Sequence, residues 1–116
     1  MTDNILDTTK HMLGIPSTDT AFDVDILVGI NSAFMNLNQV GVGPDATFSI
    51  EDNTKTWEDF LEDPTKYQAV KSYIYLKTKL LFDPPASSFV LASMERQIVE
   101  LEWRLMVQVP IPPETI

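Results

Sequence analysis

The chain has 116 residues, of which 44% are hydrophobic and none is cysteine, and its 17 acidic and 8 basic residues give a formal net charge of −9. A domain of this size can bury a real core. The missing cysteines exclude disulfides and thiolate zinc sites, and the acidic balance disfavours binding to nucleic-acid phosphates, which depends mainly on Lys and Arg. Because the start MTDNILDTTK lacks a signal-peptide pattern and no apolar run approaches the ~18 residues of a membrane span, we expect one soluble domain that is not exported.

Two helices are expected in the first 40 residues. Residues 3–13 carry apolar side chains at helical spacing and are followed by a glycine and a proline, which end helices. The second helix, at 20–40, begins with Thr20 and Asp23 at the spacing of a capping box. Its apolar residues then recur at steps of three or four: Phe22, Ile26, Ile30, Ala33, Leu37 and Val40.

Residues 41–55 show no periodicity and form a connector that is long for a compact domain. Only residues 47–50 have the composition of a short strand, which leaves a strand or hairpin as an option within the loop. Long loops of this kind are often functional or mobile, so Phe48 and Ile50 are candidate contacts to a partner. A flexible surface loop is an equal alternative.

A short turn that starts at Thr56, with a second capping-box spacing to Asp59, precedes a long helix expected at 64–82. Apolar residues cover most of its circumference, which is typical of a central helix. Lys77 lies between the two apolar rows, so its ammonium is either buried and paired or reaches water at the end of a covered stem, and we favour the second. Asp83 and two prolines then end the helix, because proline lacks the backbone N–H donor.

A last helix is expected at 88–107, in an antiparallel hairpin with the helix at 64–82. Its core row alternates steps of three and four: Leu91, Met94, Ile98, Leu101 and Leu105. A second row, formed by Val99, Trp103 and Met106, lies a third of a turn or more away. A helix that packs on one core does not need this row, so we predict that it contacts another subunit or a neighbouring element. The alternative is that the N-terminal helix covers it.

The chain ends in an extended tail at 110–116, which follows a single helical domain at 1–109. Its prolines exclude a helix, while its apolar residues suit docking against a partner. The candidate docking residues are Pro110, Ile111, Pro112, Pro113 and Ile116. A frayed terminus is the alternative. The predicted fold class is all-α, a small bundle of about four helices with a long loop between the second and the third.

No pattern for catalysis or metal binding is present. His11 is the single histidine and has no cysteine or second histidine with which to build a site. The acidic runs at 51–52 and 58–63 lack the spacing of a calcium loop, and Gly41 and Gly43 are not followed by a phosphate cradle. We therefore expect no enzyme activity, no metal and no cofactor.

Three stretches and their spacing resemble the small head–tail connector, or head-completion adaptor, proteins of long-tailed bacteriophages. They are FDVDILVGINSAFMNLNQVGVGP at 22–44, TWEDFL at 56–61 and AVKSYIYLKTKLLFDPPASSFVLASMERQIVELEWRL at 69–105. The resemblance implies a structural virion protein of the head–tail interface, present in the host cytoplasm during assembly, that forms a twelvefold ring beneath the portal. Its partners would be the portal protein and a downstream connector or tail-completion protein. Genomic DNA would pass through the ring without sequence-specific binding, and no membrane would be involved.

A function of another class is a monomeric acidic inhibitor that mimics DNA. A mimic needs carboxylates spaced like phosphates along one exposed face, whereas much of the acidic charge here lies in loops and helix starts, so ring assembly is favoured. If a ring forms, its channel wall should be acidic or neutral, because many copies of a subunit of charge −9 do not readily present a basic bore. Lys77 and Lys79 are the residues most able to contradict this expectation.

Overall fold

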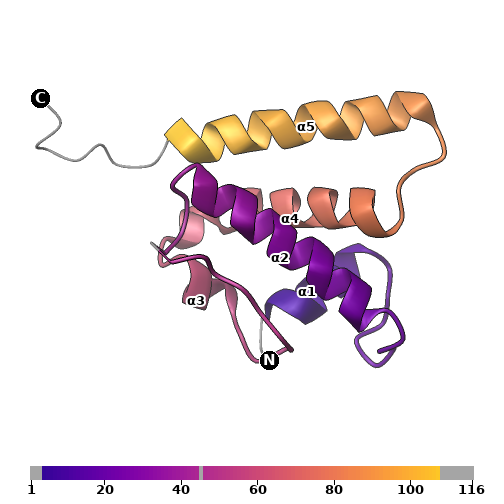
Figure 1. Cartoon of the computed structure of the whole chain (residues 1–116), viewed down its shortest axis with the longest axis horizontal. Helices are drawn as coiled ribbons and strands as arrows, with labels where there is room; N and C mark the ends of the chain where they lie inside the picture. The colour runs from indigo at the N-terminus through magenta and orange to yellow at the C-terminus, as the bar shows by residue number, and fades with distance from the viewer. Residues whose placement is uncertain (1–3, 45, 108–116) are drawn as a thin grey trace, which may run out of the picture.

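The computed structural model describes residues 4–44 and 46–107, and this part of the chain is helical with no named strand (Figure 1). The helices are α1 (Ile5–Met12), α2 (Asp23–Gln39), α3 (Trp57–Phe60), the short 3-10 turn η1 (Pro64–Lys66), α4 (Tyr67–Phe82) and α5 (Ser88–Val107). Four of them are long enough to form the body of the molecule, and α3 is a single turn. The predicted all-α bundle of about four helices, with a long loop before α3, is confirmed.

The first helix is fastened to the second through a buried lysine. The side chain of Lys10 is only 1% exposed, and its Nζ lies 2.8 Å from Asp23 Oδ1 and 3.1 Å from the carbonyl oxygen of Ser17, to which it donates. This pairing explains why the capping box expected at Thr20 and Asp23 does not form. The residue before α2 is Phe22, which makes no side-chain cap, and the Asp23 carboxylate binds Lys10 instead.

The closest helix packing is between α2 and α4, which cross at Gly29. A Cβ atom at Gly29 would lie 3.0 Å from Thr78 Cγ2 and 3.1 Å from Thr78 Cα, so the two backbones approach as closely as a glycine allows. Large side chains from both helices form the centre of the core: Ile26, Ile30, Phe34, Leu37, Val70, Tyr73 and Ile74. Phe34 stands outside the predicted apolar row of α2, but it packs with the rings of Phe48 and Phe60.

The optional strand at 47–50 is not formed, and the segment belongs to the predicted long loop, which runs along the core. The Asn31 side chain supplies the hydrogen bonds that a neighbouring strand would have made. Its Oδ1 accepts from the backbone N–H of Ile50 at 2.8 Å, and its Nδ2 donates to the Ile50 carbonyl at 3.0 Å. The Phe48 ring also contacts Phe34 and Phe60, at centroid distances of 4.9 and 5.3 Å. A helix side chain and an aromatic cluster therefore hold this loop.

The last two helices, α4 and α5, form the predicted antiparallel hairpin, and Pro84 and Pro85 lie in the connection between them (Figure 1). The predicted core row of α5 faces α4, since Met94, Ile98 and Leu105 are buried and the other two members are partly buried. A hydrogen bond adds to this packing, because Tyr73 donates its hydroxyl proton to Glu102 Oε2 at 2.7 Å. Burial, together with the bond to this carboxylate and its charge, raises the pKa of Tyr73 well above its ordinary value.

Substitution of Gly29 tests the crossing of α2 and α4. Alanine favours a helix over glycine by about 1 kcal/mol, but its methyl group would press on the Thr78 backbone as well as on its side chain. We expect Gly29→Ala to lower the free energy of unfolding by about 1–3 kcal/mol in denaturant titrations, as overpacking does. Ser32→Ala, on the same helix, is the control and should change it little. A Gly29→Ala variant more stable than the parent would show that the helices can separate without loss.

The Tyr73 hydroxyl predicts how stability responds to alkaline pH. The folded state keeps this proton at pH values where the unfolded chain, with a tyrosine pKa of about 10, has released it. The free energy of unfolding should therefore fall as the pH rises above about 10, because the unfolded state then binds fewer protons. Urea titrations between pH 8 and 11 should show a smaller fall in Tyr73→Phe than in the parent. An unchanged slope in Tyr73→Phe would refute the assignment.

Candidate functional site

The acidic runs act locally, as caps of turns and short helices. Asp59 accepts from the backbone N–H of Thr56 at 2.8 Å, and this bond contributes to a lowered pKa of its carboxyl. Asp63 does the same for Thr65, whose hydroxyl and N–H hold the pKa of that carboxyl below its ordinary value. Within residues 4–44 and 46–107 no group of three or more His, Cys, Asp or Glu side chains is placed to hold a metal ion. None of the helices in these ranges is both long and apolar enough to cross a membrane.

The second apolar row of α5 lies on the outer face of the hairpin. Val99 is 69% exposed, Trp103 is 59% exposed and Met106 is 42% exposed. The first helix, α1, packs against α2 and α4 and does not cover them. We call these three residues the α5 outer row. Their exposure leaves a large apolar area available for contact with a partner.

The other predicted contact residues lie elsewhere. Ile50 is buried and Phe48 is partly buried within the core of the chain. The loop between α2 and α3 that carries them lies on the side of α4 away from α5 (Figure 1). Both side chains therefore contribute to folding of the subunit. The tail residues Pro110, Ile111, Pro112, Pro113 and Ile116 lie outside the described residues. The structure thus places the α5 outer row apart from the loop residues, and they do not form one site.

A second exposed apolar cluster surrounds the ends of α2 and α4 near the hairpin turn. Leu81 is 62% exposed because it lies in the last turn of α4, where neither α2 nor α5 covers it. It lines a surface hollow with Phe22, Val28 and Phe82. The rings of Phe22 and Phe82 also meet edge to face at a centroid distance of 5.4 Å. Helical periodicity alone could not reveal this cluster, because it follows from where the neighbouring helices end.

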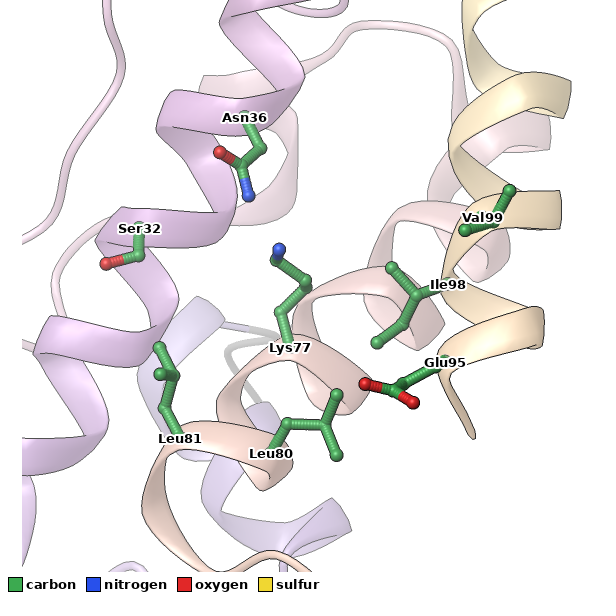
Figure 2. Close-up of a pocket in the computed structure, with 8 residues that line it drawn as sticks. All are labelled: Ser32, Asn36, Lys77, Leu80, Leu81, Glu95, Ile98 and Val99. Carbon is green, nitrogen blue, oxygen red and sulfur yellow. The ribbon is translucent and has the colours of Figure 1, made fainter. Parts of the chain in front are cut away.

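Between these two apolar regions runs a groove of about 390 Å³, with α2 on one wall, α5 on the other and α4 as its floor (Figure 2). Its lining residues are Ser32, Asn36, Lys77, Leu80, Leu81, Glu95, Ile98 and Val99. Lys77 is partly buried and extends from α4 toward Asn36 (Figure 2). We call this hollow the α2–α5 groove. It shares Leu81 with the hollow near the hairpin turn and Val99 with the α5 outer row, so the three features form one continuous surface.

The comparisons with known proteins point to a virion assembly component. A family model described as "Phage connector protein" matches residues 5–110, from the first residue of α1 to beyond the end of α5. No curated protein and no solved structure matches the chain. Since the matched family covers every helix described above and its members are structural proteins of the phage connector, the chain belongs to the phage connector protein family.

Proposed function

We propose that this protein is a head–tail connector subunit that assembles into a ring beneath the portal, follows the portal's twelvefold symmetry and links the capsid to the tail. Membership of the phage connector family supports a role in virion assembly. The observation that carries the ring itself is the α5 outer row, in which Trp103 is 59% exposed between exposed aliphatic side chains. Exposed tryptophan and methionine of this kind are typical anchors of protein interfaces.

A ring of identical subunits needs two different surfaces on each subunit, one that meets the neighbour on each side. The α5 outer row can supply one of them. The exposed cluster of Phe22, Val28 and Leu81 at the hairpin end can supply the other, since it is apolar and lies at a different part of the molecule. Exposed clusters of large apolar side chains such as these favour assembly.

The charge of the chain suits a channel through which DNA slides. Each subunit has a formal net charge of −9, so a ring would concentrate negative charge around its axis. Duplex DNA is held mainly by Lys and Arg that neutralise its phosphates, and a wall without a basic stripe would not trap it. The partners in this proposal are the portal protein above the ring and a downstream connector or tail-completion protein below it, in the assembled virion and, before that, in the host cytoplasm.

Replacement of Trp103 tests the proposed ring contact. Because Trp103 is exposed, Trp103→Ala should leave helicity and the melting temperature nearly unchanged while it weakens ring formation at least about tenfold, as loss of an interface anchor does. Native mass spectrometry across concentration, with and without portal protein, measures the assembly. The matched control is Trp57→Ala, which removes a buried side chain and should cost about 3–5 kcal/mol of stability.

Two outcomes would contradict the proposal. Normal rings of Trp103→Ala on the portal, together with a collapsed melting temperature, would place this side chain in the subunit core. A parent chain that stays monomeric in all conditions and competes with DNA for a nuclease or repressor would favour the acidic DNA mimic.

A further inference from the structure

Lys77 is a cation without a partner in the described part of the chain. Its stem is covered within the α2–α5 groove, and its ammonium makes no ion pair or hydrogen bond with residues 4–44 or 46–107. Two other lysines are paired, since Lys10 binds Asp23 and Lys79 binds Asp83. The groove combines apolar side chains, such as Leu80 and Ile98, with one carboxylate, that of Glu95. Glu95 lies beside Leu80, whereas the Lys77 ammonium points away from it, toward Asn36 (Figure 2). A ligand that fits it should combine an apolar side chain with a carboxylate.

We infer that the α2–α5 groove binds residues 108–116 of a second copy of this chain, with Glu114 of that copy paired to Lys77. The inference rests on the proposed ring, because it names the contact that joins one subunit to the next. It commits to a specific segment of the same polypeptide, the one that follows α5 and lies outside the described residues.

The chemistry of this segment matches the groove. Its sequence, QVPIPPETI, holds one charged side chain, Glu114, and no basic one, so the Glu114 carboxylate complements the Lys77 ammonium. Proline-rich segments favour the polyproline II conformation, in which residues three apart lie on the same edge, about 9 Å from each other. Ile111 and Glu114 have this spacing. Ile111 can therefore enter the apolar part of the groove while Glu114 reaches Lys77, and a segment stiffened by prolines loses little entropy on docking.

The geometry favours a second copy over the subunit's own tail. The groove contacts α5 at residues 95–99, which lie about 12–18 Å back from Val107 along the helix axis at 1.5 Å per residue. To reach its own groove, the segment would have to reverse direction directly after α5. The residues before its prolines prefer extended backbone, which disfavours a reversal through consecutive helical residues directly after α5. Nine residues in the polyproline II conformation would span about 28 Å, far enough to meet a neighbour.

The contact is heterologous, because a tail on one subunit meets a groove on the next. Such contacts generate a closed ring when the rotation between subunits closes, and an open filament otherwise. The groove also adjoins the α5 outer row through Val99. The docked tail of one copy and the outer row of another would thus form a single interface.

The test is a titration of the full-length chain, labelled with ¹⁵N and kept at a concentration where it is monomeric, with a synthetic QVPIPPETI peptide. We expect saturable shifts of the amide signals of Asn36, Lys77 and Val99. Lys77→Glu should weaken peptide binding at least about tenfold, and a peptide with Glu114→Lys should restore binding to that variant. The matched control is Lys79→Glu, two residues further along α4 but paired with Asp83 outside the groove, which should bind the original peptide like the parent.

Three results would overturn the inference. The first is the absence of groove shifts at millimolar peptide, and the second is a Lys77→Glu chain that binds the peptide as tightly as the parent. The third is a change of the groove signals in full-length Glu114→Lys that occurs without peptide and does not depend on concentration, since this would show that each tail occupies its own groove. The titration contains no portal protein, so rings that form normally without peptide binding would leave the proposed function intact and reject only the tail contact.

Discussion

The architecture depends on how closely α2 and α4 approach each other at Gly29 and Thr78. With no side chain between the two backbones at that point, the apolar residues on either side meet directly and close the core. The same crossing makes α4 the helix on which both α2 and α5 pack. In Figure 2, α2 and α5 lie on either side of α4. The space between α2 and α5 is not filled by side chains, and it forms the α2–α5 groove. A substitution at Gly29 would therefore change the core and the groove together.

Two forces of opposite sign would act when such subunits come together. The exposed apolar residues of α5 and of the hairpin end favour contact, at roughly 25 cal/mol for each Å² removed from water. The net charge of −9 on every copy opposes it. Salt screens that repulsion over a distance of about 8 Å at physiological ionic strength, whereas the apolar term is not screened. A chain of this kind can remain dispersed while it is dilute and still assemble where a partner raises its local concentration.

Much of the fold could be predicted from the sequence, because long helices with a regular apolar period carry a strong local pattern. The bounds of α5, the proline stop and the capping box at Thr56 were predicted in this way and are confirmed. The sequence left open whether residues 47–50 form a strand, and they form a loop in which the side chain of Asn31, nineteen residues before Ile50, binds the backbone N–H and carbonyl of Ile50. The composition of a short segment does not identify a hydrogen-bond partner so far away in the sequence.

The surface was harder to predict than the core. The pattern placed Lys77 between two apolar rows of α4, and the structure confirms that its stem is covered while its ammonium reaches a groove. That a groove exists at all depends on the relative placement of three helices, which no local spacing specifies. The exposure of Leu81 likewise depends on the placement of neighbouring helices, because it is set by where α2 and α5 begin. The α5 outer row was recognised because its surplus of apolar residues is visible within one helix.

The hydrogen bonds between Asn31 and the 46–56 loop affect how copies of this chain can contact one another. Segments rich in apolar and β-branched residues often pair edge to edge with identical segments on neighbouring molecules, which leads to uncontrolled aggregation. Here the backbone donor and acceptor of Ile50 are already occupied by a side chain of the same subunit, and the adjoining Phe48 is packed against other rings. The loop therefore offers a neighbouring copy fewer free backbone groups, and association is left to helix faces, whose geometry limits how many partners each molecule can accept.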